Sequence, residues 1–249
     1  MSGHSKWATI KRKKEATDAK RSNMYAKLLR AVEVAAREGG GSVEGNMTLA
    51  SAVEKAKAFS VPNENIERAI KRGTGELGDG QKYEEIVYEG YAPGGIALLI
   101  EALTDNRNRT AQEVRHAFTR NGGNLGETGT VAWQFTRKGV IVVEKSAAPD
   151  EERLLELALE GGAEDLTDSE SSWDIVTSPQ DFTTVQGALE AAGVPIFSAE
   201  ISMLPQSTIP VAGSEATAVL RLIDALEDLD DVQNVYANFD IPEEVMASL

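Results

Sequence analysis

The chain has 249 residues, of which 41% are hydrophobic and 26% charged, a composition typical of a soluble folded protein. It contains no cysteine, which excludes disulfides, thiolate zinc sites and cysteine nucleophiles. The N-terminus has no apolar stretch of the signal-peptide type, and no apolar run is long enough to cross a bilayer, so we expect a cytoplasmic protein.

Charge is distributed very unevenly. The whole chain has a net charge of −15, yet residues 1–37 hold ten Lys or Arg against three acids. Residues 144–200 hold fourteen acids against Lys145 and Arg153 alone, a net of −12. Such a partition indicates separate modules with separate partners, with phosphate expected at the basic end.

The first 80 residues are predicted to form a basic domain of three helices. Met24, Leu28, Val32 and Ala35 recur at helical spacing in the first helix, which ends at the glycines 39–41. A second helix follows Asn46. A third runs from Pro62-Asn63 to Gly73, with Asn63 as the expected N-cap, and residues 73–80 form a linker.

After the linker the pattern changes to that of a mixed α+β domain. The strands expected first are 83–90 and 96–103. A helix follows over 110–120, in which Thr110 and Glu113 match a capping box, and the next strand is 131–135.

The acidic region that follows is predicted to contain strand 140–144, helix 149–160, strand 163–167, strand 173–177, helix 179–192 and strand 196–203. This βαββαβ order is that of a ferredoxin-like domain. A last helix (216–226) and strand (232–239) are too short to fold alone and are expected to complete the sheet that begins at Tyr83. The prediction is therefore an α+β multidomain protein with domains 1–80, 81–136 plus 205–249, and an inserted ferredoxin-like domain 137–204.

No enzymatic or cofactor signature is found. Residues 73–78 match GxGxxG, but they follow a helix and precede a polar linker, whereas a dinucleotide site follows a strand and opens a helix. His4 and His116, the two histidines, have no paired-ligand spacing. We expect no metal, no cofactor and no catalysis.

The basic residues are the best candidates for a nucleic-acid site, because Lys and Arg bind phosphates with release of counterions. Trp7 lies within the basic run and could stack on a base or pack inside its own domain. A second group of basic residues precedes and lines the predicted helix 110–120, and it could hold phosphate there or simply cap the helix. Two further basic residues, Arg137-Lys138, are expected in a hairpin turn. The candidate residues are Lys6, Trp7, Lys11, Arg12, Lys13, Lys14, Lys20, Arg21, Lys27, Arg30, Arg107, Arg109 and Arg115, with Arg120 beside them.

Several long motifs resemble those of the YebC family. They are GHSKW (3–7), IKRKKEATDAKR (10–21), PNENIERAIKRGTGE (62–76), YEEIVYEGYAPGG (83–95), LTDNRNRT (103–110), GGNLGETGTV (122–131) and DVQNVYANFDIP (231–242). The resemblance spans essentially the whole chain.

The resemblance implies three domains and a non-enzymatic protein. Family members are described as probable DNA-binding transcriptional regulators; a competing interpretation makes them translation factors that contact ribosomal RNA and relieve stalled synthesis, and related mitochondrial proteins activate translation of a cytochrome oxidase subunit. The partner expected from the resemblance is therefore DNA or ribosomal RNA. The charge partition separately favours the ribosome or basic proteins as partners of the acidic domain. A protein-interaction module whose basic arm contacts an acidic partner is the remaining alternative.

Overall fold

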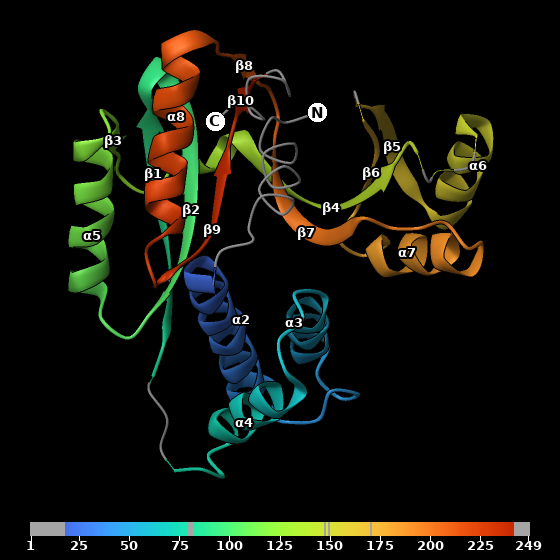
Figure 1. Ribbon diagram of the computed structural model, residues 1–249, viewed down its shortest axis with the longest axis horizontal. Coiled ribbons are helices and arrows are strands. Elements are labelled where there is room, and N and C mark those ends of the chain that lie inside the picture. The colour runs from blue at the N-terminus through green and yellow to red at the C-terminus, as the bar shows by residue number, and fades with distance from the viewer. Residues whose placement is uncertain (1–17, 79–81, 147, 149, 170, 242–249) are drawn as a thin grey trace. The chain divides into compact units, whose positions relative to one another are not determined.

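The computed structural model describes residues 18–78, 82–146, 148, 150–169 and 171–241. The described residues within Lys11–Thr130 and Ser214–Val235 form one compact unit, and those within Val131–Gly213 and Tyr236–Leu249 form another. Each unit combines helices with strands (Figure 1), which confirms the mixed α+β class. None of the described helices is both long and apolar enough to span a membrane.

The described part of the first unit begins with three helices: α2 (Asp18–Gly39), α3 (Met47–Ala58) and α4 (Asn63–Gly73). Their shared core includes Leu28, Val32, Leu49 and Ile66, so the apolar stripe seen in the sequence is buried as predicted. Asn46 is the N-cap of α3 and accepts a hydrogen bond from the Leu49 amide.

The N-cap expected for α4 is wrong. Pro62 is the capping residue and Asn63 is the first residue of the helix, with no side-chain capping bond. Proline at this position replaces a polar cap because its fixed φ prepares the chain for the helical turn that follows.

The central sheet of this unit has the order β3-β1-β2-β9. Its strands are β1 (Glu84–Ala92), β2 (Ile96–Thr104), β3 (Asn124–Leu125) and β9 (Val232–Ala237), and the turn η1 (Pro93–Gly95) joins β1 to β2 in an antiparallel hairpin. The prediction that the last strand completes the sheet begun near Tyr83 is confirmed, because β9 neighbours β2.

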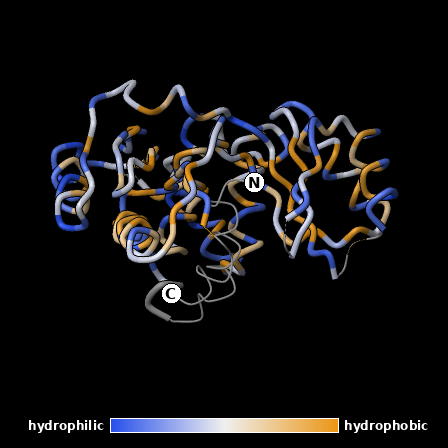
Figure 2. Tube along the Cα trace, turned by 90° about the horizontal axis from the view of Figure 1, so that it is seen from above, coloured by the Kyte–Doolittle hydropathy of each residue, from blue (hydrophilic) through white to orange (hydrophobic). Residues whose placement is uncertain are grey.

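Two helices, α5 (Arg107–Arg120) and α8 (Gly213–Glu227), pack against this sheet. A Cβ on Gly123 would lie 2.7 Å from Leu222 of α8 and 2.9 Å from Phe118 of α5, so both helices approach the chain at this glycine. Figure 2, which looks nearly down the axes of both helices, shows the contrast between them: the turns of α8 are mostly in the hydrophobic colour and those of α5 mostly in the hydrophilic colour.

The second unit contains the turn η2 (Ala132–Gln134), then β4 (Phe135–Glu144), α6 (Glu151–Gly161), β5 (Ala163–Asp168), β6 (Ser172–Thr177), α7 (Phe182–Ala191) and β7 (Ser198–Pro205). The strands form an antiparallel sheet in the order β5-β6-β4-β7. Ile141 and Ile175 from the sheet pack with Leu154 of α6 and Leu189 of α7, so both helices cover the same face. The short strands β8 (Ile209–Pro210) and β10 (Phe239–Asp240) pair in parallel.

The predicted hairpin turn at Arg137-Lys138 is wrong, and so is the strand expected over 131–135. Both basic residues lie within β4, which begins at Phe135 after the turn η2. The pairing of β4 with β6 begins only at Gly139, whereas Arg137 and Lys138 pair with β7 alone. Polar residues fit there because that stretch has a strand neighbour on one side only.

Candidate nucleic-acid interface

Helix α5 begins three residues earlier than the sequence suggested. Its N-cap is Asn106, whose side chain accepts a hydrogen bond from the Arg109 amide at 3.2 Å. Thr110, the predicted cap, is fully buried in the first turns and donates to Asp231 instead. Asn and Thr are both good N-cap residues. Because the hydroxyl of Thr110 bonds the buried carboxylate of Asp231, it is not used for capping, and Asn106 takes the N-cap position.

The outward face of α5 carries a continuous polar stripe. Thr110, Val114, Ala117 and Phe118 face the interior, and the exposed stripe on the other side consists of Asn108, Gln112, Arg115, His116 and Thr119. The spacing from Asn108 to Thr119 corresponds to about 16 Å of helix. The single acid of α5, Glu113, is half-buried and falls outside this stripe.

These side chains are of the kinds that contact nucleic acids. Arginine binds phosphate oxygens or guanine edges, Asn and Gln bond adenine edges, and threonine bonds phosphates. Arg115 is exposed and forms no ion pair within the described part of the chain. The stripe therefore offers hydrogen-bond donors to a polyanion without an acid among them.

Arg107 lies at the start of the same helix. Its guanidinium is 3.5 Å from Glu84, and the two side chains are 67% and 60% exposed. An ion pair this long and this exposed contributes little free energy, so a phosphate could replace the carboxylate readily.

Arg109 is held differently, because its guanidinium, although 44% exposed, is paired with the buried carboxylate of Asp231. The Asp231 carboxylate, 2% exposed, accepts hydrogen bonds from Arg109 at 2.7 Å, Thr110 at 2.7 Å and Thr104 at 3.0 Å. Arg30 of α2 donates to its other oxygen at 3.0 Å. Four donors from three segments thus converge on one carboxylate in the turn before β9.

Burial alone would raise the pKa of Asp231, but the hydrogen bonds from Arg109, Thr110 and Thr104 outweigh it and hold the pKa below its ordinary value. The pKa of Arg109 is raised by the same bond to Asp231 and by a second bond to Asp105. The charges in this network are therefore fixed, and their geometry serves the fold.

Two predicted site residues of α2 are likewise engaged inside the protein. Lys27 is 8% exposed and donates to the Glu227 carbonyl. Arg30, besides its bond to Asp231, donates to the carbonyls of Leu103 and Asp230 and lies 5.2 Å from the Tyr83 ring centre. Lys27 thus joins α2 to the end of α8, and Arg30 joins it to β2 and to the turn before β9.

The remaining predicted residues divide into two groups. Lys20 and Arg21 belong to the first turns of α2. Lys6, Trp7, Lys11, Arg12, Lys13 and Lys14 lie outside the described residues. Of the second predicted group, Arg107, Arg109, Arg115 and Arg120 are all exposed on α5, but the guanidinium of Arg109 is paired with Asp231.

Sequence reasoning missed the uncharged members of the α5 stripe and the role of Asp231. Asn108, Gln112 and Thr119 recur at spacings of four and seven, a signal that could have been found once the helix was started at Asn106. Asp231 gave no such signal, since its partners lie far away in the sequence. Trp133 was also missed; it is 67% exposed and its carbonyl accepts a hydrogen bond from Gln206.

The GxGxxG pattern has a packing explanation. A Cβ on Gly73 would lie 2.3 Å from the Glu33 carbonyl oxygen, so this glycine allows α4 to approach α2 closely. Gly75 and Gly78 have positive φ values in the turn that follows. Within the described residues, no group of three or more His, Asp or Glu is arranged to hold a metal ion.

Comparison with known proteins gives full-length matches. Residues 5–76 match the family described as the TACO1/YebC protein N-terminal domain, and residues 83–239 match the TACO1/YebC second and third domain. A protein of Pelotomaculum thermopropionicum is 59% identical over 98% of this chain and all of its own length, and one of Geobacter sulfurreducens is 55% identical over the whole of both. Both relatives are named probable transcriptional regulatory protein.

A solved structure is also similar. The crystal structure of a conserved hypothetical protein from Aquifex aeolicus superposes with a TM-score of 0.81 and 51% sequence identity, covering 92% of this chain and 93% of that one.

Proposed function

Because the chain belongs to the TACO1/YebC family, we propose that it is a non-enzymatic regulator of gene expression that binds nucleic acid, acting on transcription through DNA in the cytoplasm. The names of its relatives support a regulatory role in transcription. The observation that carries nucleic-acid binding is the exposed, acid-free stripe of α5 around Arg115.

The proposed interface combines this stripe with the basic N-terminal segment. Arg107 and Arg115 contact phosphates from α5, and Trp7 stacks on a base. The cations of the N-terminal segment are Lys6, Lys11, Arg12, Lys13, Lys14, Lys20 and Arg21. Lys27, Arg30 and Arg109 are left out, because their charged groups are engaged by carbonyls and by Asp231.

We also propose that the chain is organised as three functional domains: a basic helical domain 1–80, a middle domain 81–136 plus 205–249, and an acidic ferredoxin-like domain 137–204 inserted in it. The element order β4-α6-β5-β6-α7-β7 and the sheet order β5-β6-β4-β7 support the ferredoxin-like assignment.

A second candidate is binding to ribosomal RNA with an effect on translation. Helix α5 is preceded by β2 and followed by β3, so it is not the second helix of a helix-turn-helix motif. An exposed helix without that framework is also suited to structured RNA, which proteins recognise largely by shape and by backbone contacts.

The test is fluorescence anisotropy of the full chain with a labelled duplex DNA and a labelled RNA hairpin, each over a salt series. Arg115→Ala should weaken binding by roughly three- to tenfold and reduce the slope of log K against log salt by about one for a phosphate contact. Arg153→Ala on α6 removes the same charge from the acidic unit and should leave both quantities unchanged.

The choice of nucleic acid decides between the two candidates. Stronger binding to duplex DNA than to RNA at equal salt supports transcription, whereas preference for the hairpin and co-sedimentation with ribosomes supports translation. Equal effects of Arg115→Ala and Arg153→Ala would contradict the α5 interface, and absence of binding to both nucleic acids at physiological salt would contradict the proposed function.

A further inference from the structure

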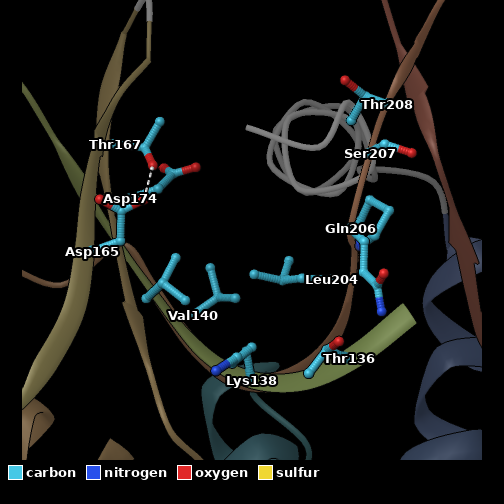
Figure 3. Close-up of a pocket in the computed structure, with 12 residues that line it drawn as sticks. Thr136, Lys138, Val140, Asp165, Thr167, Asp174, Leu204, Gln206, Ser207 and Thr208 are labelled. Atoms are coloured by element: carbon cyan, nitrogen blue, oxygen red, sulfur yellow. Dashed lines mark hydrogen bonds between the residues drawn. The ribbon is translucent and has the colours of Figure 1, made fainter. Parts of the chain in front are cut away.

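The sheet of the second unit has a pocket on the face opposite its helices. Side chains alternate along β4, so that Ile141 packs beneath α6 and α7 while Val140 faces the other way, into a cavity of about 390 Å³. Figure 3 shows Asp165, Thr167 and Asp174 on one wall, and Leu204, Gln206 and Thr208 on the opposite wall. Thr136, Lys138 and Val140 of β4 lie between them.

The lining has an apolar floor and a polar, acidic wall. Val140, Val176 and Leu204 supply the apolar part. Asp174, 2% exposed, accepts a hydrogen bond from Ser172 at 3.2 Å. Asp165 accepts one from Thr167 at 3.3 Å and forms no ion pair with any described residue.

The four described cations of this unit do not offset these carboxylates, and one of them, Arg137, alternates with Thr136 and Lys138 along β4 and so faces away from the pocket. Lys138, the one cation among the described residues that line the pocket, pairs with Glu164 outside it. Lys145 pairs with Asp168, and Arg153 pairs with Glu156. With fourteen acids between residues 144 and 200, the charge left over near the sheet is negative, which repels phosphate and attracts cations.

We propose that this pocket binds an arginine or lysine side chain from a basic segment of a partner protein. The aliphatic stem of such a side chain would lie on Val140, Val176 and Leu204, as long cationic side chains do on apolar surfaces. The charged head would reach Asp165, and the hydroxyls and amide of the rim would accept its remaining hydrogen bonds. Charge complementarity selects the partner and raises the rate of encounter.

This proposal is independent of the nucleic-acid interface, since it uses a different surface and the opposite charge. Nucleic acid is the competing class of ligand for a sheet face, and the local carboxylates argue against it. The two classes respond oppositely to removal of a carboxylate, because a cation loses an attraction and a polyanion loses a repulsion.

The probe is a fluorescein-labelled peptide of five Gly-Arg repeats, titrated with the full chain at physiological salt. Asp165→Asn should raise the dissociation constant of the peptide by at least about fivefold, since the removed charge faces the bound head directly. Thr136→Trp fills the pocket from an exposed position on β4 without changing charge, and should weaken binding similarly. Glu160→Gln, an equal loss of charge on α6, should change binding by less than about twofold.

Equal effects of Asp165→Asn and Glu160→Gln, with no effect of Thr136→Trp, would show that the peptide senses only net charge and would overturn the proposal. A single-stranded oligonucleotide that binds more tightly to Asp165→Asn and is blocked by Thr136→Trp would overturn it in favour of nucleic acid. Far-ultraviolet circular dichroism verifies that each variant is folded, because the tryptophan added in Thr136→Trp would confound the fluorescence of Trp133 and Trp173.

Discussion

The two units use their cations in different ways. In the first, Arg30 and Arg109 are both held by Asp231, a carboxylate that is 2% exposed, whereas Arg115 faces solvent without such a partner among the described residues. In the second, Lys138 and Lys145 are paired with Glu164 and Asp168, carboxylates that are 42% and 64% exposed. The charge each unit presents is therefore decided by which groups are neutralised internally, and not by the count of Lys and Arg in its sequence.

The two kinds of ion pair also differ in energy. Removing one partner of a buried pair leaves a desolvated charge and costs several kcal/mol, whereas an exposed pair contributes between zero and about 1 kcal/mol. Asp231 is 2% exposed and Glu164 is 42% exposed, so the two units provide an internal test of this difference.

The largest effect is expected from Asp231→Asn. The amide cannot accept all four donors or balance two guanidinium groups, so we expect the unit to lose about 3 kcal/mol of unfolding free energy. The measurement is a urea titration followed by circular dichroism, with the transition of this unit assigned by amide hydrogen exchange in β9. Glu164→Gln in the other unit is the matched change and should lower the unfolding free energy by less than about 1 kcal/mol. Equal losses of unfolding free energy in the two variants would contradict the difference between the buried and the exposed ion pairs.

The same carboxylate gives a pH signature. In the folded protein the pKa of Asp231 lies below its ordinary value of 3.8. The ionised carboxylate therefore contributes fully to the unfolding free energy above pH 3.8, and this contribution is lost as the pH falls through the folded pKa. The difference in unfolding free energy between wild type and Asp231→Asn should be constant from neutral pH down to about pH 5 and should shrink below 3.8. Urea titrations at several pH values measure this difference, and a gap that widens on acidification would contradict the network.

A smaller effect is expected at Gly73. A methyl group there would lie 2.3 Å from the Glu33 carbonyl oxygen and 2.8 Å from the Ala36 Cβ, so Gly73→Ala should force α4 away from α2 at a cost of about 2 kcal/mol. Gly187→Ala on α7 is the control, because no heavy atom lies within 4 Å of its Cβ position and alanine favours the helix. Faster amide exchange in α2 and α4 of Gly73→Ala is the expected observation; unchanged exchange there would show that the helices are not in close contact.

Local sequence patterns predicted most of the helices and strands, whereas the site residues that were predicted wrongly depend on long-range contacts. The helix α2 and the succession of strands and helices after Gly139 could be predicted because their patterns involve only residues that are neighbours in the sequence. Asp231 bonds Arg109 and Arg30 across 122 and 201 residues, and no local pattern encodes such partners. Arg30 was therefore predicted to be a phosphate ligand, whereas in the structure it is bonded to Asp231.

The start of α5 shows why one element was misplaced. Both Asn106 and Thr110 are good capping residues followed by helix-forming sequence, so the sequence alone permits either start. In the structure Asn106 is the N-cap, because Thr110 is buried and its hydroxyl bonds Thr104 and Asp231. The error mattered for function, since a helix begun at Thr110 omits Asn108 and hides the spacing of the exposed stripe.

The smallest loss of unfolding free energy is expected from removing the N-caps of α5 and α6, one in each unit. Asn106→Ala removes the acceptor of the Arg109 amide, and Asp150→Ala removes that of the Arg153 amide. Each should cost about 1 kcal/mol in its own unit, measured by urea titration with the two transitions separated by Trp173 fluorescence and by hydrogen exchange. In Asn106→Ala the loss should be confined to the first turn, so that binding through Arg115, two turns further on, is nearly unchanged. A change in nucleic-acid affinity as large as that of Arg115→Ala would instead mean that the first turn, with Arg107 and Asn108, is the main contact on α5.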